Sequence, residues 1–175
     1  MKILDKRVAY KGRFTSYWIS NFETKKGKQG KWEHIKRNEN TQAVIINVIN
    51  EDKIILVKQF RCAAGCFVLE FPAGLIDPNE DASIAAVREL REETGYIGKV
   101  ISISPPLCTS PGITDEIIYI AEMELTGEKT DQDLDECEEI EVVEFSKSNF
   151  SQEIKEYLEN HKDTILDSKV WTAYS

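Results

Sequence analysis

Three glutamates lie close together in one short stretch of the chain, Glu89, Glu92 and Glu93. Their spacing of i, i+3 and i+4 would place all three on one face of an α-helix. Carboxylates this close repel each other, and one of them would have to hold a proton unless a cation neutralises them. Mg²⁺ prefers oxygen ligands and commonly combines one or two carboxylates with substrate phosphates. The spacing therefore predicts a divalent-cation site, with Mg²⁺ as the expected ion and Mn²⁺ as the alternative.

Two neighbouring features support this interpretation. Arg88 precedes the first glutamate and can hold a carboxylate in a bidentate pair, which fixes its direction. The loop from Ala73 to Asp77 contains Gly74, and glycine permits sharp backbone geometry and close approach to a ligand. A backbone carbonyl in this loop can supply a further oxygen ligand. An acidic helix face is by itself common in acidic proteins, so the cluster alone would indicate only a solvated surface.

The wider segment from Phe71 to Tyr96, FPAGLIDPNEDASIAAVRELREETGY, separates these alternatives. Its Gly, Glu, Arg-Glu and Glu-Glu-x-Gly positions stand at the fixed spacings of the Nudix signature. Tyr96 is the one departure, because the family more often has an aliphatic residue there. The sequence is thus identified as a member of the Nudix hydrolase family, and the resemblance implies an α/β/α sandwich with a mixed β-sheet.

Other stretches resemble the ADP-ribose pyrophosphatase branch of that family. They are ILVKQFR at 55–61, EFPAGLID at 70–77 and EETGY at 92–96. That branch tends to carry a proline about 16 residues after the last motif glycine, and Pro111 lies 111 − 95 = 16 residues after Gly95. The resemblance implies Mg²⁺-dependent cleavage of ADP-ribose, or of a related nucleoside diphosphate sugar, and for ADP-ribose the products are AMP and ribose 5-phosphate.

The resemblance also assigns the metal ligands and the catalytic residues. The metal would be held by the Ala73 carbonyl and by Glu89, Glu92 and Glu93, with Arg88 among the catalytic residues. Glu80 is expected to be structural, because it stands nine residues before Glu89 and, at about 100° per residue, would lie on the opposite face of the helix. Family members often take a general base from a late loop. Glu138 fits that position best, and Glu136 and Glu139 are rivals.

The substrate-binding residues follow from the same resemblance. They are Phe14, Trp32, Arg37, Arg61, Leu75, Pro111 and Gly112. Trp32 and Phe14 match the positions that clamp adenine between subunits in similar dimeric enzymes, with Trp18 as a weaker substitute for Phe14. The alternative for both aromatics is packing of the N-terminal strands, and the alternative for Arg61 is a surface residue at a strand end.

Alternative functions differ in what they require of the sequence. Hydrolysis of another nucleoside diphosphate derivative, or of an oxidised nucleotide, would use the same motif. A non-catalytic Nudix nucleotide-binding module usually loses motif glutamates, whereas this chain keeps Arg88 and the three glutamates. An mRNA-decapping role is disfavoured by the negative charge and by the lack of an extended basic surface segment.

Apolar periodicity predicts the elements that position the motif. A helix is expected from Asp81 to Thr94, with Asp81 as N-cap and Gly95 after its last turn. Expected strands cover Ala43–Val48, Ile54–Phe60, Phe67–Phe71, Val100–Ser104, Ile117–Met123 and Ile140–Phe145, and expected helices cover Phe150–Leu158 and Lys162–Trp171. The acidic stretch Thr126–Glu139 is expected to be a mobile loop.

The N-terminal region has a different composition. Strands from Phe14 to Phe22 and from Lys31 to Arg37, around a turn at Gly27–Gly30, predict a β-hairpin. A hairpin alone is marginally stable, so it must pack on the main domain or on a second subunit. We therefore expect residues 1–40 to be an extension for dimerisation and base clamping, residues 41–175 to be the Nudix domain, and the protein to be a homodimer.

Length and charge limit the remaining partners. The 175 residues carry a formal charge of −9, which disfavours nucleic acid as a partner. We expect no membrane partner and a cytoplasmic location, because no apolar run approaches the ~18 residues that a membrane span needs. The four cysteines form no CxxC pair and lie far in sequence from both histidines, so a zinc site is not expected.

Overall fold

The computed structural model describes residues 1–37, 42–50 and 52–174. The chain forms two compact units, one of residues 1–43 with 105–119 and the other of residues 44–104 with 120–175. The predicted boundary between residues 40 and 41 lies outside the described residues.

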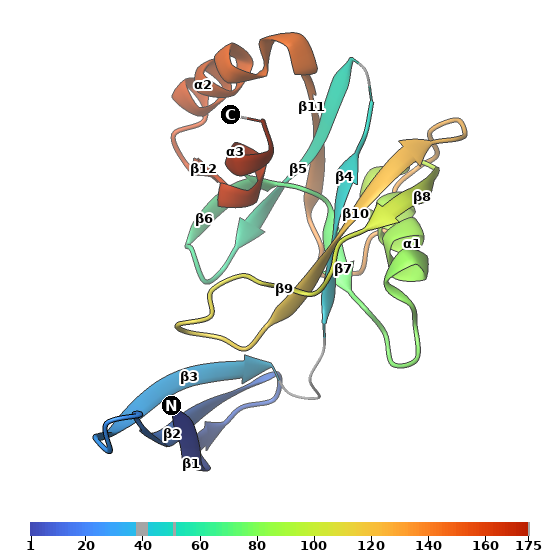
Figure 1. The fold of residues 1–175 in the computed structure, drawn as a ribbon. Helices are drawn as coiled ribbons and strands as arrows, with labels where there is room; N and C mark the ends of the chain where they lie inside the picture. Colours follow the sequence, from blue (N-terminus) through green and yellow to red (C-terminus); the bar gives the residue numbers. More distant parts are fainter. Residues whose placement is uncertain (38–41, 51, 175) are drawn as a thin grey trace. The chain divides into compact units, whose positions relative to one another are not determined.

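The N-terminal unit is built on a three-stranded antiparallel sheet (Figure 1). Its order is β1 (Lys2–Lys11), β2 (Thr15–Glu23) and β3 (Gln29–Arg37). The predicted hairpin corresponds to β2 and β3, whereas β1 was missed. Every residue of β1 is exposed. Because no face of β1 is buried, its sequence lacks the apolar alternation by which a half-buried strand is found.

A segment distant in sequence completes this unit. Residues 107–108 form β9 (Leu107–Cys108), which pairs with the first residues of β10 (Ile117–Leu125). The Ile35 amide donates to the Ile113 carbonyl at 2.8 Å. Two ion pairs, Lys36–Asp115 at 2.5 Å and Arg37–Glu116 at 3.2 Å, flank that contact. Such pairing between distant segments cannot be read from local periodicity.

The second unit contains two sheets. One has the order β7 (Ala73–Leu75), β4 (Ala43–Val48), β10 and β8 (Gly98–Ile103). The other has the order β11 (Ile140–Ser146), β5 (Lys53–Arg61), β6 (Cys66–Glu70) and β12 (Thr164–Leu166). β12 runs parallel to β6 while β11, β5 and β6 are antiparallel, so the sheet is mixed, as predicted.

The buried apolar positions of this unit come mainly from β4, β5 and helix α1 (Ala82–Thr94). Their fully buried side chains include Val44, Ile46, Val48, Ile54, Leu56 and Leu90. The helix packs against β7 and β8 of the first sheet and against β11 of the second. The predicted α/β architecture is therefore confirmed, and the six strands expected between residues 43 and 145 are all present. The expected loop Ala73–Asp77 is wrong in its first half, because Ala73–Leu75 forms β7 by pairing with β4, and the two-residue strand β9 was not expected.

The C-terminal region differs from its prediction. Helix α2 (Phe150–Asn160) follows a 3₁₀ turn, η2 (Lys147–Asn149), and agrees with the expected helix. The second expected helix, Lys162–Trp171, is wrong in its first half, because Thr164–Leu166 forms β12 and only Ser168–Tyr174 is helical (α3). Pairing with β6 and burial of Thr164 outweigh local helix propensity there. No helix among the described residues is long and apolar enough to cross a membrane.

Both ends of α1 are fixed as the sequence predicts. Asp81 is the N-cap, and its Oδ1 accepts the Ser83 amide at 2.8 Å. Gly95 ends the helix with φ of 73°, and its amide donates to the Arg91 carbonyl at 2.8 Å. A Cβ at Gly95 would lie 2.1 Å from the Thr130 carbonyl oxygen. The helix end thus requires glycine both for its conformation and for space.

We expect Gly95→Ala to destabilise the fold more than Gly65→Ala does. Both glycines have positive φ, which costs other residues roughly 1–2 kcal/mol. A Cβ at Gly65 meets nothing within 4 Å, whereas one at Gly95 collides with backbone and adds roughly 1–3 kcal/mol. Urea unfolding of the two variants and the parent chain measures the difference, and equal losses would show that the Thr130 contact does not constrain the helix end.

Candidate active site

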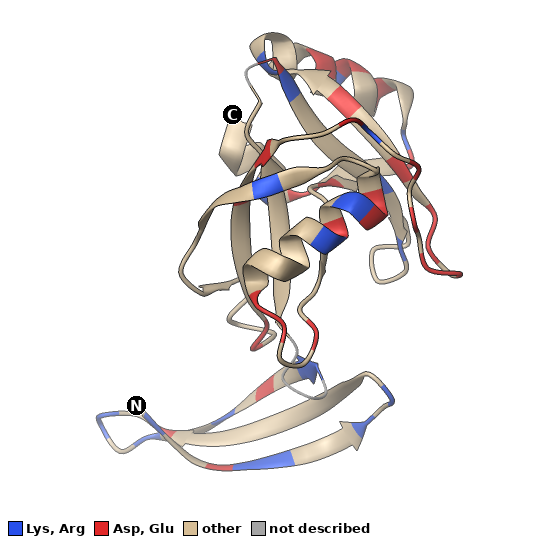
Figure 2. Cartoon of the chain, turned by 90° about the vertical axis from the view of Figure 1, so that its right-hand side faces the viewer, with Lys and Arg blue, Asp and Glu red and all other residues tan. Residues whose placement is uncertain are grey.

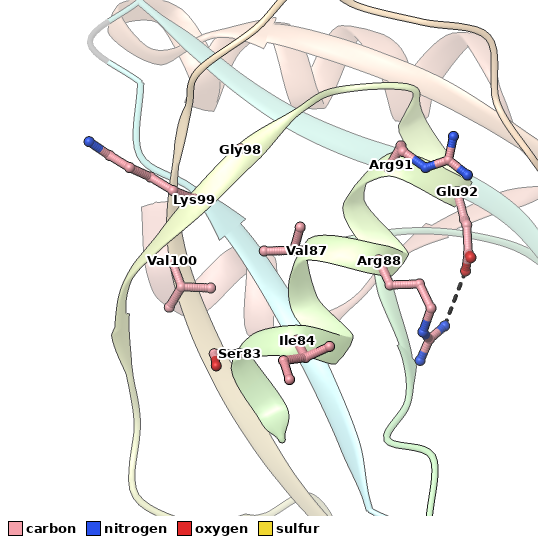
Figure 3. Close-up of a pocket in the computed structure, with 9 residues that line it drawn as sticks. All are labelled: Ser83, Ile84, Val87, Arg88, Arg91, Glu92, Gly98, Lys99 and Val100. Atoms are coloured by element: carbon pink, nitrogen blue, oxygen red, sulfur yellow. Dashed lines mark hydrogen bonds and ion pairs between the residues drawn. The ribbon is translucent and has the colours of Figure 1, made fainter. Parts of the chain in front are cut away.

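Arg88 lies at the centre of the glutamate cluster. Its guanidinium donates to both carboxylate oxygens of Glu80, at 3.0 and 2.8 Å, and to the Leu75 carbonyl at 3.0 Å. It also donates to Glu89 at 2.8 Å and to Glu92 at 3.1 Å, the latter contact being drawn in Figure 3. These carboxylates raise the pKa of Arg88, so the group stays charged. One side chain therefore joins the motif loop to the acidic helix.

Glu80 has a structural role here, as expected, but its position was predicted incorrectly. The nine-residue spacing between Glu80 and Glu89 predicted that the two residues lie on opposite faces of the helix. Glu80 in fact precedes the N-cap Asp81, so the helical periodicity does not apply to it. Its Oε2 also accepts the Asp77 amide at 3.0 Å, and the Arg88 pair lowers its pKa. Glu80 thus fixes the Arg88 fork rather than lying away from it.

Glu93 is the most enclosed of the three helix glutamates, with 5% of its surface exposed. Its Oε2 accepts the Ala73 amide at 3.0 Å, which ties α1 to the start of the motif loop. Burial raises the pKa of Glu93 to about 8, with further contributions from the charges of Glu89 and Glu138. A carboxylate in this position is unfavourable as an isolated anion, so it has a strong electrostatic preference for a nearby cation.

Glu89 lies directly against the glycine of the motif loop. A Cβ at Gly74 would come within 1.8 Å of the Glu89 carboxylate. Burial raises the pKa of Glu89, the nearby Arg88 lowers it, and Glu92 and Glu138 raise it further. Gly74 is therefore needed for the space that Glu89 occupies. Close approach to a ligand at this glycine, which the sequence predicted, stays a prediction.

The acidic loop after β10 is attached to the C-terminal end of α1. The Thr130 amide donates to the Gly95 carbonyl at 2.8 Å, and the Asp133 amide donates to the Glu92 carbonyl at 2.9 Å. Gln132 donates through Nε2 to the carbonyls of Glu93 and Ile140. Residues 126–139 contain no helix or strand, in agreement with the predicted loop. Gln132 was not singled out from the sequence, since nothing local distinguishes it.

Glu138 is the loop acid whose charge acts on the cluster. It raises the pKa of both Glu89 and Glu93. Its Oε2 accepts the Asp135 amide at 3.2 Å. Neither Glu136 nor Glu139 is among the residues that raise the pKa of Glu89 or Glu93. Among the three candidates left open by the sequence, the structure therefore brings Glu138 to the cluster.

Arg61 stands at the end of β5 and pairs with Glu70 at the end of β6. The distance from Nε to Glu70 Oε1 is 2.6 Å. Its charge lowers the pKa of Glu93, so it contributes positive potential to the same site. The Arg61 side chain is 42% exposed, whereas Glu70 is buried. A glutamate in an otherwise apolar strand, FVLEF, is the sequence signal that could have identified Glu70 as a partner.

The remaining predicted substrate residues fall into two groups. Leu75 belongs to the second unit and is 41% exposed next to the Arg88 contact. In the N-terminal unit, Trp32 Nε1 donates to the Gly112 carbonyl at 3.0 Å. This contact places the indole beside the Pro111-Gly112 turn. Trp32 and Phe14 remain 52% and 68% exposed.

Arg37 is engaged within the same N-terminal unit. It pairs with Glu116, which also accepts the Thr109 hydroxyl at 3.2 Å. The predicted phosphate or ribose contact of Arg37 therefore competes with an existing carboxylate partner.

The donor chemistry at α1 fits a hard divalent cation. Ala73 and the glutamates 89, 92 and 93 supply only oxygen atoms, and two of the carboxylates have raised pKa values. Within residues 1–37, 42–50 and 52–174, no three acidic, histidine or cysteine side chains converge as a complete metal-ligand set. Arg88 is instead the cation nearest to Glu89 and Glu92.

The charged positions of α1 all lie in its second half, where Figure 2 shows blue basic and red acidic positions next to each other. A family model, NUDIX domain, matches residues 39–165. The chain belongs to the Nudix family. Enzymes of this family hydrolyse their substrates and generally use divalent metal ions.

Several relatives carry the resemblance across most of the chain. An ADP-ribose pyrophosphatase of Bacillus subtilis is 35% identical over 146 residues, 82% of this chain and 77% of its own. An ADP-sugar pyrophosphatase of Mus musculus is 31% identical over 72% of this chain and 62% of its own. A methanol dehydrogenase activator of Bacillus methanolicus is 34% identical over 174 residues, 98% of this chain and 89% of its own.

A solved structure supports the fold. The crystal structure of an ADP compounds hydrolase superposes with a TM-score of 0.69 over 91% of this chain and 94% of its own, at 23% identity. The predicted family and its ADP-ribose pyrophosphatase branch are confirmed by these matches, and the chain is an enzyme of the Nudix hydrolase type.

We expect Gly74→Ala to lower turnover by about 100-fold while the Nudix hydrolase stays folded. The added methyl displaces the end of the Glu89 side chain, and ångström-scale misplacement in an active site costs about that much. Gly65→Ala is the matched control, because its Cβ meets nothing. Steady-state hydrolysis alongside circular dichroism measures both effects, and full activity of Gly74→Ala would show that the position of Glu89 is unimportant.

Proposed function

We propose that this Nudix hydrolase cleaves the pyrophosphate bond of ADP-ribose, or of a related nucleoside diphosphate sugar, with Mg²⁺ as its metal. ADP-ribose gives AMP and ribose 5-phosphate. The observation that carries the proposal is the set of ion pairs that Arg88 makes with Glu80, Glu89 and Glu92. The chain is also 35% identical to an ADP-ribose pyrophosphatase.

Glu89, Glu92, Glu93 and the Ala73 carbonyl would hold the metal. When bound, Mg²⁺ supplies positive charge to the substrate phosphates and to the leaving phosphate. Arg88 keeps the Glu89 and Glu92 carboxylates directed toward the site, since its fork is fixed from behind by Glu80. Burial disfavours the Glu93 anion, so a nearby cation would be needed to stabilise the charged carboxylate.

Glu138 is the proposed general base. It is exposed, it lies where its charge reaches Glu89 and Glu93, and it belongs to a loop outside the regular elements. A carboxylate in this position can take a proton from the water that attacks phosphorus. Mn²⁺ would be an alternative metal, because it accepts the same oxygen ligands.

The substrate residues divide by chemistry. Arg61 carries a charged group close to Glu93, and we assign it to the phosphates, with Leu75 beside the site. In the other unit, Trp32 and Phe14 offer exposed aromatic faces on which adenine can stack, at about 1–3 kcal/mol per base.

Three further residues of that unit complete the assignment. Pro111 and Gly112 form the turn that accepts the Trp32 indole hydrogen. Arg37 contributes to ribose or phosphate recognition if it exchanges its Glu116 partner.

The working assembly is proposed to be a homodimer. β1 is exposed along its whole length and presents large apolar side chains, among them Ile3, Leu4 and Val8. A strand so exposed is a liability in a monomer, because its backbone edge and apolar residues promote association. A C2 dimer through residues 1–40 would cover this surface and bring aromatic residues of two subunits together.

We expect a substrate panel to separate the candidate functions. ADP-ribose, other sugar nucleotides, dinucleotides and oxidised nucleoside diphosphates are compared, with phosphate release measured after phosphatase coupling. Turnover should be highest with ADP-ribose or a close relative, stop in EDTA and return with Mg²⁺ or Mn²⁺. A preference for oxidised nucleotides would favour a sanitising enzyme, and hydrolysis that persists in excess EDTA would contradict the proposed metal chemistry.

Glu93→Gln in the same assay should lower turnover about 100-fold or more, because the variant keeps the shape of the side chain but loses a ligand charge. Glu159→Gln, on the exposed face of α2, is the control and should leave turnover unchanged.

A third prediction concerns the base clamp and the dimer. Trp32→Ala should raise the KM for ADP-ribose by the equivalent of about 1–3 kcal/mol, with a smaller effect on kcat, because stacking is present before and during the reaction. Trp171→Ala is the control, since its indole is about as exposed but lies on α3. Light scattering should give twice the 20.0 kDa chain mass, and a monomer at micromolar concentration would exclude a clamp shared between subunits.

A further inference from the structure

The acidic loop between β10 and β11 carries Glu138, the proposed general base, and one side chain joins the two ends of its last part. The Gln132 amide nitrogen has two hydrogens and donates to two carbonyls, that of Ile140 at 3.2 Å and that of Glu93. Ile140 is the first residue of β11 and lies eight residues further along the chain. Gln132 therefore closes the segment 133–139, which contains Glu138.

The same amide links the loop to the acidic helix. Carbonyls in the last turn of a helix have no partner within the helix, and those of Glu92 and Glu93 belong to the last turn of α1. The Asp133 amide donates to the Glu92 carbonyl at 2.9 Å, and Gln132 donates to the Glu93 carbonyl. The end of α1, the loop and the start of β11 thus meet at Gln132.

Glu138 itself belongs to a compact turn within this segment. Its amide donates to the Asp135 carbonyl at 2.9 Å, and its Oε2 accepts the Asp135 amide at 3.2 Å. In the part of the chain that the structure describes, these are the hydrogen bonds found for residues 134–139, so none of them reaches the helix or a strand. The position of the turn relative to α1 therefore depends on how the two ends of the segment are held.

We propose that Gln132 is a positioning residue for the hydrolysis. By bridging the Glu93 and Ile140 carbonyls, it sets where Glu138 stands relative to the metal-binding helix. This role rests on the proposed function of Glu138 as general base. A base must lie within hydrogen-bond reach of the attacking water, and ångström-scale displacement in an active site costs about 100-fold in rate. Gln132 acts through Glu138 and is not itself a catalytic residue.

Gln132→Met tests this role, because methionine has a similar length but lacks the two N–H donors. With ADP-ribose at saturating Mg²⁺, kcat should fall at least about tenfold while KM changes little, since a base acts in the transition state. Gln152→Met on α2 is the matched control. Its amide also donates to a neighbouring group, Glu156 Oε1 at 2.8 Å, and its loss should leave kcat unchanged.

A double-mutant cycle separates action through Glu138 from a general effect on the site. Glu138→Gln should lower kcat about 100-fold, and adding Gln132→Met should then cost less than about twofold, because the base that Gln132 positions is already gone. If Gln132→Met costs the same factor with and without Glu138, the glutamine acts on the Glu93 ligand or on the fold, and the proposal is overturned. Parent kcat in Gln132→Met alone overturns it as well.

Amide hydrogen exchange gives a reading that needs no turnover. The amides of Asp133, Asp135 and Glu138 should exchange severalfold faster in Gln132→Met than in the parent chain, and at the parent rate in Gln152→Met. Equal exchange in Gln132→Met and the parent chain would overturn the proposal whatever the substrate is. Faster exchange together with parent kcat in Glu138→Gln would show that the loop is closed as described but that Glu138 is not the base, and the role of Gln132 would then fail with the proposed function.

Discussion

The arrangement of the active site depends on the guanidinium of Arg88. Five donors in a planar fork meet four different groups, and no other side chain offers that combination. Glu80 and the Leu75 carbonyl fix the fork from the motif loop. Glu89 and Glu92 are then held from the helix. Without this cation, closely spaced carboxylates on one helix face would repel each other and lose their common direction.

Other constraints follow from bringing the loop and the helix together. Gly74 is needed because the Glu89 carboxylate occupies the space of a side chain, and Gly95 is needed because the Thr130 carbonyl lies against the helix end. Glu93 completes the arrangement by accepting the Ala73 amide while almost fully buried. Much of the Nudix motif can thus be understood as the set of residues that lets acidic groups approach a loop closely.

Local features of the fold were predictable from the sequence, whereas distant pairings were not. The bounds of α1 follow from its Asp81 cap and Gly95, and the strands β4 and β5 follow from short apolar runs. The features that were missed are strands β1, β7, β9 and β12 and the pairing of residues 105–119 with β3. β1 has no buried face, β7 and β9 are only three and two residues long, and the parallel pairing of β12 with β6 outweighs helical propensity.

In the candidate active site, too, local features could be predicted from the sequence and contacts between distant segments could not. The spacing of Glu89, Glu92 and Glu93 placed them on one helix face, and the motif resemblance was needed to separate a metal site from a solvated acidic surface. The position of Glu80 was misjudged because it precedes the helix whose periodicity was applied to it. Glu70 and Gln132 escaped notice because their roles depend on contacts with segments far along the chain. That Glu138, rather than Glu136 or Glu139, acts electrostatically on Glu89 and Glu93 likewise depends on the fold of the loop and not on local sequence.

The central claim, that the Arg88 fork organises the site, is tested most directly by Arg88→Lys. Lysine keeps the positive charge but cannot hold several carboxylates and a carbonyl in one plane. The measurement is kcat/KM for ADP-ribose at saturating Mg²⁺, with the fold checked by circular dichroism. The account predicts a loss of about 100-fold or more in a folded protein, in line with ångström-scale displacement of catalytic groups. A folded Arg88→Lys protein with the parent kcat/KM would contradict it.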